Sequence, residues 1–588
     1  MKDPNVELEP QVTGVDHTTG KQCTLNRRQP RFPLRMAICN GRGSEHDPEA
    51  GASARIAPTR RLNRWVVRGG ALVALLTLGT ACRWIGLEIS DGRLLGTRVD
   101  GVRAFLGIPY AAPPVGPLRW KPPAPPTPWR GVRNATRPRS ECPQLIPLLG
   151  YLGAEDCLYL NVWAPDEGAE NLPVMVWFHG GAFKQGSAAD PISNGARLAR
   201  TQRVVVVGVN YRLGTLGFMA HPTLTSESGA SGNWGVLDQQ AALRWVRDNI
   251  RSFGGDPNSV TIFGESSGGD NVCTHMISPA SRGLFHRGIS QSGMCPSTWH
   301  DRDPTLAEAE DYGLEVAAQL GCAEPPEALA CLREASPRAL VEAGNRTAPI
   351  QPGGVFYIEP PDYRAMAPNV DGVTIPDDRA VLYESGDIAD VPLIFGSNKD
   401  EGTLFHTPFF FAEPVDTPEA YRAALERRFG ATRAKMVEAL YPSESFPSPD
   451  SALAEVTGDW LFVCRARWMS RVLSARGLPV FLYSFEKPLR SPALPDGGVI
   501  HAAEIPFVFG TSLALFGLGP IEAEHQELSD NMMGYWSRFA ATGDPNGDGA
   551  VNWPRYDEMT DQHLVLDDPV RAGTGHKRAR CDLWDSFL

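Results

Sequence analysis

Two uninterrupted apolar stretches stand out in the first half of the chain, LPVMVWF at residues 172–178 and VVVVGV at residues 204–209. Both are rich in β-branched or aromatic residues and are bounded by glycine and turn residues. This pattern is typical of strands that are buried on both faces of a sheet. We therefore predict two interior strands here.

A helical pattern and a third strand pattern follow. Between residues 237 and 250, apolar side chains recur at helical spacing from Ala242 to Ile250, and the sequence Gly-Gly-Asp-Pro at 254–257 ends the helix. Residues 258–269, NSVTIFGESSGG, then have the pattern of a strand, a turn and the start of a helix. Because strands and helices alternate, we predict an α/β fold with a largely parallel sheet and helices on both faces.

The turn after the third strand contains the pattern G-x-S-x-G, formed by Gly264, Ser266 and Gly268. Glycine at these positions lets the neighbouring backbone pass close to a serine that is held in a strained conformation. The same pentapeptide also occurs in ordinary loops. Its place between a strand and a helix favours Ser266 as a nucleophile at the carboxyl end of a central strand.

A serine hydroxyl needs a base to take its proton and an acid to orient that base. In α/β hydrolases both follow the serine in the chain, and among the later histidines His501 is the best placed, between strand-like and apolar residues. A predicted strand at 391–396 ends just before two adjacent carboxylates, Asp400 and Glu401. The spacing alone does not choose between these two acids.

An oxyanion hole is the remaining component of such a site. Gly180, Gly181 and Ala182 follow the predicted strand at 172–178, and small residues allow backbone N–H groups to point at a developing oxyanion. The N–H group of Ser267 would supply a further donor.

Composition and charge exclude one large class of function. The chain has 588 residues, 42% of them hydrophobic, which is enough for a large core. A net charge of −12, and the lack of a basic stripe with interleaved aromatic residues after the N-terminal segment, argue against a nucleic-acid partner.

The N-terminal segment differs from the rest of the chain. Residues 1–57 are rich in Pro, Gly, Arg and Asn, so we expect a disordered segment or an extension from a mis-assigned start codon. Residues 58–82 have the charged, apolar and small-residue parts of a secretory signal, with a buried helix as the alternative. The apolar run is too short to span a bilayer, so no transmembrane segment is predicted.

Export would place the protein in the medium or the periplasm. Cys82 follows small residues and is a candidate lipid attachment site that would make the protein a membrane-anchored lipoprotein. Gly79 stands where leucine is usual, three positions before such a cysteine.

The chain contains 11 cysteines. Two pairs flank short loops that disulfides can close in an oxidising compartment, Cys142 with Cys157 and Cys322 with Cys331. We expect four others to be buried thiols: Cys273, Cys295, Cys464 and Cys581. Since no C-x-x-C sequence has a matching partner pair, no zinc site is predicted, and the predicted chemistry requires no metal or cofactor.

Several longer stretches resemble the type-B carboxylesterase/lipase family, the cholinesterase-like α/β-hydrolases. They include GIPYAAPPVGPLRW at 107–120, EDCLYLNVWAP at 155–165, HGGAF at 179–183, NYRLGTLGF at 210–218, GGDPNSVTIFGESSGG at 254–269, SNKDEG at 397–402 and HAAEIPFVFG at 501–510. The resemblance covers residues 86–588 and implies one α/β-hydrolase domain of mostly parallel sheet.

The resemblance also implies the roles of individual residues. Ser266 is the nucleophile, His501 the base and Glu401, in preference to Asp400, the acid. The oxyanion hole is implied to be formed by Gly181, Ala182 and Ser267. The resemblance supports the disulfides Cys142–Cys157 and Cys322–Cys331 as well.

Some positions depart from the family pattern. Ser267 stands where alanine is usual, and Ala502 follows His501 where glycine is usual. The short loop from Cys142 to Cys157 carries no tryptophan, and Leu404 replaces an aromatic residue, so a quaternary ammonium group would lose its cation–π partner. We therefore expect no preference for choline esters.

Five aromatic side chains have two open interpretations, as the lining of an apolar substrate pocket or as plain core: Trp299, Phe405, Phe409, Phe410 and Phe411.

The resemblance implies a serine carboxylesterase that hydrolyses carboxylic esters with water through an acyl-enzyme. A lipase, amidase or carbamate hydrolase with the same residues is an alternative, and a non-catalytic binding protein is another. Because His501 must be neutral to act as a base, activity should rise as its imidazole loses its proton. The physiological ester and the oligomeric state are not predicted.

Overall fold

The computed structural model describes residues 14–15, 22–23, 84–146, 149–297, 302–322, 327–347, 367–406, 415–491, 494–512 and 525–587. The chain divides into two units, Met1–Thr77 and Leu78–Leu588. In the first unit, strands β1 (Gly14–Val15) and β2 (Gln22–Cys23) pair antiparallel. Apart from this pair, the predicted extension and the signal-like segment lie outside the described residues.

One sheet of 13 strands forms the framework of the second unit. Its order is β19 (Arg571–Thr574), β18 (Gln562–Leu566), β15 (Val480–Phe485), β14 (Leu393–Asn398), β13 (Arg287–Gln291), β12 (Gly255–Glu265), β10 (Leu172–Phe178), β11 (Val205–Val209), β9 (Tyr159–Pro165), β5 (Val102–Pro109), β4 (Gly92–Val99) and β3 (Trp84–Ile89), with β6 (Val132–Asn134) beside β4. The strands from β11 to β18 are parallel to one another. Strands β9, β5, β4 and β3 pair antiparallel along the order, as β19 does with β18, and β6 pairs parallel with β4. The predicted parallel core is confirmed.

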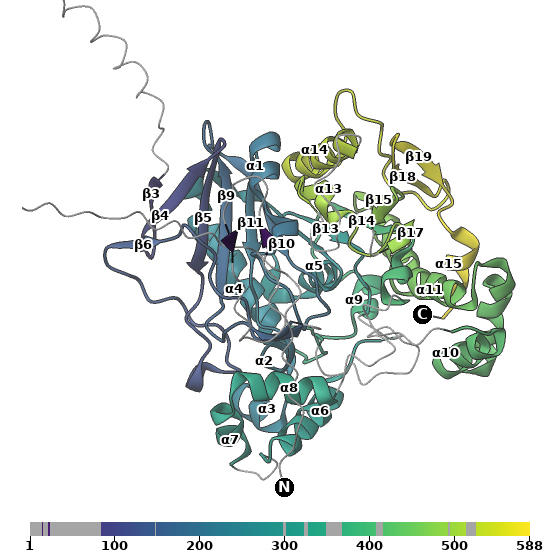
Figure 1. Ribbon diagram of the computed structural model, residues 1–588, viewed down its shortest axis with the longest axis horizontal. Coiled ribbons are helices and arrows are strands. Elements are labelled where there is room, and N and C mark those ends of the chain that lie inside the picture. The colour runs from purple at the N-terminus through teal and green to yellow at the C-terminus, as the bar shows by residue number, and fades with distance from the viewer. Residues whose placement is uncertain are drawn as a thin grey trace, which may run out of the picture. The chain divides into compact units, whose positions relative to one another are not determined.

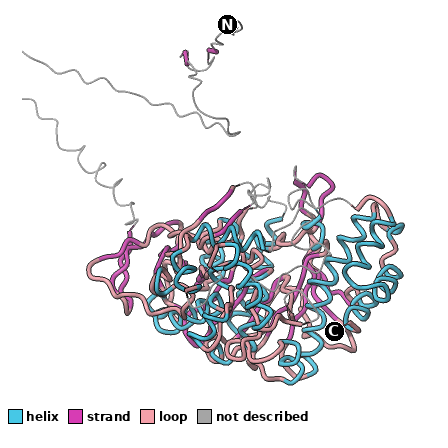
Figure 2. The backbone as a smooth tube through the Cα atoms, turned by 90° about the horizontal axis from the view of Figure 1, so that it is seen from below, coloured by secondary structure: helices cyan, strands magenta, loops and turns pink. Residues whose placement is uncertain are grey.

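Helices cover both faces of this sheet (Figure 1), and the strands run between them (Figure 2). The helices are α1 (Ala196–Gln202), α2 (Gly214–Phe218), α3 (Pro222–Ser228), α4 (Trp234–Asn249), α5 (Ser267–Ile277), α6 (Leu306–Gln319), α7 (Ala328–Glu334), α8 (Pro337–Thr347), α9 (Arg379–Ser385), α10 (Pro418–Leu440), α11 (Pro449–Gly458), α12 (Cys464–Ala475), α13 (Ile505–Phe509), α14 (Gln526–Thr542) and α15 (Arg578–Asp585). Among the described residues of the second unit, two small antiparallel pairs lie outside the sheet, β7 (Gln144–Ile146) with β8 (Gly150–Leu152) and β16 (Leu489–Ser491) with β17 (Leu494–Gly498).

The elements predicted around the candidate nucleophile are present. Strand β11 is buried throughout, as expected for a strand covered on both faces, and β10 is buried from Val174 onward. The predicted helix is α4, which passes into a short 3-10 helix at Ile250–Phe253 before the glycine stop. Strand β12 and helix α5 then follow, with one residue, Ser266, between them.

The described residues form four disulfides. Cys142–Cys157 and Cys322–Cys331 form as predicted, with Cα–Cα distances of 5.0 and 5.5 Å.

The expectation of buried thiols was wrong for the other four cysteines, which form the disulfides Cys273–Cys295 and Cys464–Cys581. These cysteines are buried, but the fold brings their Cα atoms to 6.2 and 4.8 Å, within the range that a disulfide spans. Their partners are 22 and 117 residues away in the chain, so no short loop marks the pairing in the sequence.

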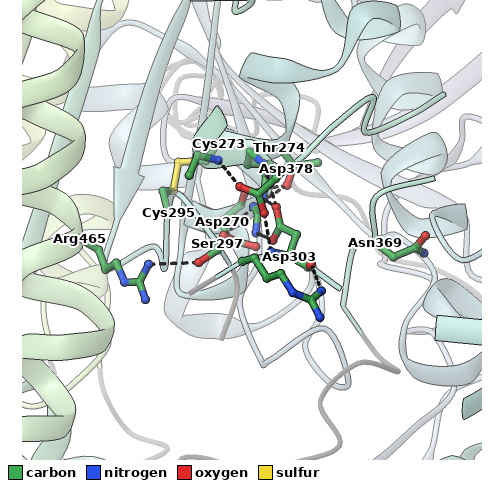
Figure 3. Close-up of polar contacts among 12 residues, drawn as sticks. Asp270, Cys273, Thr274, Cys295, Ser297, Asp303, Asn369, Asp378 and Arg465 are labelled. Atoms are coloured by element: carbon green, nitrogen blue, oxygen red, sulfur yellow. Dashed lines mark hydrogen bonds and ion pairs between the residues drawn. A yellow bond between two sulfur atoms is a disulfide. The ribbon is translucent and has the colours of Figure 1, made fainter. Parts of the chain in front are cut away.

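Buried polar contacts anchor helix α5 to the segments that follow it (Figure 3). Arg379, the first residue of α9, forms ion pairs with Asp270 of α5 at 2.9 Å and with Asp303 at 2.7 Å, and all three side chains are fully buried. The Cys273–Cys295 disulfide joins α5 to the segment after β13. The helix that begins beside the candidate nucleophile is thus fixed by both a covalent and an ionic link.

Within the described ranges we find no helix that is both long and apolar enough to span a membrane.

Candidate active site

Ser266 lies at the sharp turn between β12 and α5. Its φ and ψ angles are 58° and −126°, a region that residues with a side chain rarely adopt. Such a conformation persists only where the surroundings hold it, and here the Ser266 N–H donates to the Gln291 carbonyl at 2.9 Å. The turn is therefore a strained strand-to-helix elbow of the kind that presents a nucleophile.

Glycines allow this elbow to pack against the end of β10. A Cβ atom on Gly268 would lie 2.0 Å from the Phe178 carbonyl oxygen, and one on Gly264 would lie 2.4 Å from the Gly268 carbonyl carbon. Both contacts are far shorter than real Cβ contacts. The two glycines of the motif are thus required for the close approach of backbone segments around Ser266.

His501 and Glu401 are in direct contact. The Nδ1 atom of His501 lies 2.5 Å from Glu401 Oε2, and both side chains are buried. The other carboxylate oxygen of Glu401 accepts hydrogen bonds from the Asn398 N–H at 2.7 Å and the Ser292 hydroxyl at 2.5 Å. Asp400, the other predicted acid, accepts instead from the Val499 N–H at 2.8 Å.

The second ring nitrogen of His501 faces the elbow. Its Nε2 atom lies 3.0 Å from Oε1 of Glu265, the residue just before Ser266. Among the described residues, neither a hydrogen bond to Nε2 nor one between His501 and the Ser266 hydroxyl is present. The structure thus brings the predicted acid and base together and places the base against the elbow beside the predicted nucleophile.

Buried carboxyl groups control the protonation of this histidine. Burial by itself lowers the pKa of His501, but the charges of Glu265 and Glu401 outweigh it and raise the pKa to about 9. Burial raises the pKa of Glu265 to about 8, although the attraction of His501 opposes that shift. The surrounding charges therefore favour the protonated form of the imidazole at neutral pH.

Two aromatic rings pack against the imidazole. The ring centroids of Phe405 and Phe462 lie 5.1 and 4.6 Å from that of His501. Phe462 belongs to a π-helical turn, Asp459–Val463. Phe405 is thus a buried residue that also contacts the candidate base, while Trp299 and Phe409, Phe410 and Phe411 lie outside the described residues.

The predicted oxyanion loop lies directly over the elbow. A Cβ atom on Gly180 would lie 2.7 Å from the Glu265 carbonyl oxygen and 3.0 Å from Ser266 Cβ. The next residues all have positive φ angles, 107° at Gly181, 54° at Ala182 and 60° at Phe183. The loop is therefore a tight left-handed turn within contact distance of the nucleophile elbow.

His179 precedes this loop as an uncharged imidazole. Burial lowers its pKa to about 4, and its ring stacks on Tyr211 with a centroid distance of 4.4 Å. It therefore adds no positive charge beside the loop at neutral pH.

Sequence reasoning missed three polar residues of this site, Glu265, Ser292 and Glu504. Glu504 bonds the Gln291 and Asn398 side chains at 2.9 and 2.7 Å. Glu265 and Glu504 each stand inside an apolar stretch, TIFGES and AAEIPF, and this pattern could have indicated a buried carboxyl group at a functional site. Nothing local to Ser292 marked its bond to Glu401.

Across the part of the chain that the structure describes, we find no group of three or more His, Cys, Asp or Glu side chains that could hold a metal ion.

Solved structures with a similar fold are known. Two PNB esterase structures, one of them described as thermophilic, match with a TM-score of 0.73 each. They are 35% and 34% identical to this chain, and each match covers 85% of this chain and 99% of the other. The molecule therefore has an α/β-hydrolase fold.

Relatives with similar sequences show to which family of α/β-hydrolases the chain belongs. The para-nitrobenzyl esterase of Bacillus subtilis (strain 168) is 38% identical over 491 residues, which cover 82% of this chain and 94% of that protein. The fumonisin B1 esterase of Sphingopyxis macrogoltabida is 35% identical over 558 residues, covering 90% and 97%. Residues 85–584 match the sequence model of the carboxylesterase family. The chain belongs to the carboxylesterase family and is a carboxylic ester hydrolase.

Proposed function

We propose that the protein hydrolyses carboxylic esters through an acyl-enzyme, with Ser266 as nucleophile, His501 as base and Glu401 as acid. The observation that carries this proposal is the 2.5 Å contact between His501 and Glu401 beside the strained elbow at Ser266. An orienting carboxylate, an imidazole and a serine hydroxyl are the groups that acyl transfer needs.

In the first step, His501 Nε2 takes the proton of the Ser266 hydroxyl as the oxygen attacks the ester carbonyl. Glu401 holds Nδ1–H, fixes the tautomer and stabilises the imidazolium that forms. His501 then gives its proton to the leaving alcohol, and the acyl group stays on Ser266. Water, deprotonated by the same imidazole, attacks the acyl-enzyme, and the carboxylic acid leaves as Ser266 regains its proton.

Backbone donors stabilise the negative charge of both tetrahedral intermediates. We assign this role to the N–H groups of Gly181, Ala182 and Ser267, since the loop and the start of α5 meet at the elbow. Such donors are fixed before the reaction, so their stabilisation costs no reorganisation in the transition state.

The proton on His501 Nε2 sets the pH range of the reaction. While Nε2 carries this proton, it cannot accept one from Ser266. With the pKa of His501 raised to about 9, activity rises as the pH increases toward that value and is low in acid.

For the substrate, we propose carboxylic esters of alcohols, because relatives of this chain are named for a para-nitrobenzyl ester and for fumonisin B1. Choline esters are disfavoured. The loop from Cys142 to Cys157 contains no tryptophan, and Leu404 stands where cholinesterases often use an aromatic ring.

We also propose that the protein is exported. Four disulfides are compatible with an extracellular or periplasmic compartment, and residues 58–82 resemble a secretory signal. Lipid attachment at Cys82 is the corresponding proposal for anchoring.

The direct test is hydrolysis of p-nitrophenyl esters from acetate to palmitate by the wild-type protein and the Ser266→Ala variant. We expect turnover of short chains by the wild type and loss of nearly all activity in the variant. Ser228→Ala, an exposed serine, is the matched control and should behave as wild type. A preference for emulsified palmitate would identify a lipase, and an active Ser266→Ala protein would refute the proposed nucleophile.

A further inference from the structure

The oxyanion loop contains an unfavourable turn. Ala182 and Phe183 are consecutive residues with side chains, and both adopt left-handed φ angles, 54° and 60°. L-amino acids disfavour this region because Cβ approaches the backbone too closely. The turn that carries the Ala182 N–H group therefore needs support from its surroundings.

That support includes the side chain of Ser267. Its Oγ atom accepts a hydrogen bond from the Phe183 N–H at 3.3 Å, and both residues are fully buried. On the other side of the turn, the Phe183 carbonyl accepts from the Gly214 N–H at 2.8 Å. The end of the oxyanion loop is thus bonded to the residue that directly follows the nucleophile.

The start of the same loop is held beside the same hydroxyl. The Tyr211 hydroxyl donates to the His179 carbonyl at 2.7 Å, and it also interacts with the Ser267 side chain. The Tyr211 ring stacks on the His179 imidazole. The Ser267 side chain therefore contacts Phe183 at one end of the segment from His179 to Phe183, and Tyr211, which holds the other end.

We propose that the Ser267 hydroxyl is a positioning residue for the oxyanion hole. This inference rests on the proposed function, in which Gly181, Ala182 and Ser267 donate their backbone N–H groups to the oxyanion. A donor is effective only when it lies about 2.7–3.1 Å from the place where the charge develops. By bonding the Phe183 N–H, the hydroxyl keeps the left-handed turn in place and with it the Ala182 donor.

Ser267→Ala removes the hydroxyl and keeps the backbone donor. We expect kcat to fall about tenfold with KM changed less than about twofold, a part of the roughly hundredfold or greater loss seen when an oxyanion donor is removed outright. Affinity for a trifluoromethyl ketone, which forms an oxyanion on Ser266, should fall by a similar factor. The pH at which kcat/KM reaches half its maximum should stay unchanged, because the surroundings of His501 are unaltered.

Ala182→Gly supplies an independent variant of the same turn. Glycine adopts a left-handed φ without strain, so the turn then depends less on the hydroxyl. In a double-mutant cycle, Ser267→Ala should cost clearly less kcat in the Ala182→Gly background than in the wild type. Ser470→Ala is the matched control, since it removes another buried serine hydroxyl, bonded to the Ala466 carbonyl at 2.8 Å. It should leave kcat and ketone affinity unchanged.

Three results would overturn the inference: a Ser267→Ala protein with wild-type kcat and ketone affinity, a change in KM alone, or equal effects of Ser267→Ala in the two backgrounds. If Ser267→Ala does not fold, the same measurements on Ser267→Cys apply, and an unchanged kcat would again overturn it. A failure of the proposed function is distinguishable, because Ser266→Ala would then retain activity.

Discussion

At the scale of single residues, the protonation of His501 follows from the carboxyl groups around it. Glu265, Glu401 and Glu504 all raise the pKa of the imidazole, and together they outweigh the effect of burial. Glu401 bonds Nδ1, whereas Glu265 faces Nε2, the atom that accepts the serine proton in the proposed mechanism. In the proposed mechanism, Glu401 therefore orients the imidazole, whereas Glu265 affects the nitrogen that accepts the proton.

Glu265→Gln is predicted to move the pH profile toward acid. The substitution removes the negative charge closest to Nε2, so the pKa of His501 falls and the neutral imidazole is available at lower pH. Measuring kcat/KM between about pH 5 and pH 10 should show the rising limb shifted by about one unit or more from its wild-type position. Glu504→Gln is the comparison variant and should shift the limb less. An unchanged limb in Glu265→Gln would show that Glu265 does not control the base.

At the scale of secondary-structure elements, α5 connects Ser266, the proposed nucleophile, to the rest of the fold. Every residue of α5 is buried, and Asp270 in its first turn pairs with Arg379 of α9. Removing the arginine leaves the carboxylates of Asp270 and Asp303 buried without this cation. Removing one partner of a buried ion pair strongly destabilises a protein, because the charge that remains is buried without its counterion.

We predict that Arg379→Met lowers the free energy of unfolding by about 3–5 kcal/mol, the usual cost of breaking a buried ion pair by removing one partner. Urea-induced unfolding followed by fluorescence would measure it. Arg338→Met is the control, because its ion pair with Glu342 is largely exposed, with side-chain exposures of 66% and 36%, and should contribute little. Equal stabilities of the two variants would contradict this account of α5.

The sequence predicted these elements well and their contacts poorly. Continuous apolar runs identified β10 and β11, and the glycines around Ser266 identified the elbow, because burial and backbone geometry restrict local sequence. The contact of Glu265 with His501 joins segments that are far apart in the chain, and no local pattern encodes it. The choice of Glu401 over Asp400 came from family resemblance, not from spacing.

At the scale of the whole molecule, covalent links join distant parts of the second unit. Cys464–Cys581 connects α12 to α15 across 117 residues, whereas Cys322–Cys331 closes a separation of 9 residues. Ion pairs reinforce the longer link, since Lys577 lies 2.5 Å from Asp459 in the turn before α12. These cysteines were predicted as thiols because pairing over such a distance depends on the complete fold.

Removing the long disulfide should destabilise the protein more than removing the short one. Loop-closure entropy gives about 5 kcal/mol for a Cys464→Ala/Cys581→Ala protein and about 3 kcal/mol for Cys322→Ala/Cys331→Ala. Equilibrium unfolding of both variants under non-reducing conditions measures the difference. A larger loss for the short disulfide would show that local packing outweighs chain entropy in this molecule.

The proposed function depends on the formation of a covalent acyl intermediate on Ser266. Its most direct test is treatment of the wild-type protein with a fluorophosphonate, which modifies activated serines, followed by intact-mass measurement and peptide mapping. We expect one adduct per chain, on Ser266, with complete loss of esterase activity, and no adduct on Ser266→Ala. An adduct on another residue, or an unmodified protein that still hydrolyses esters, would contradict it.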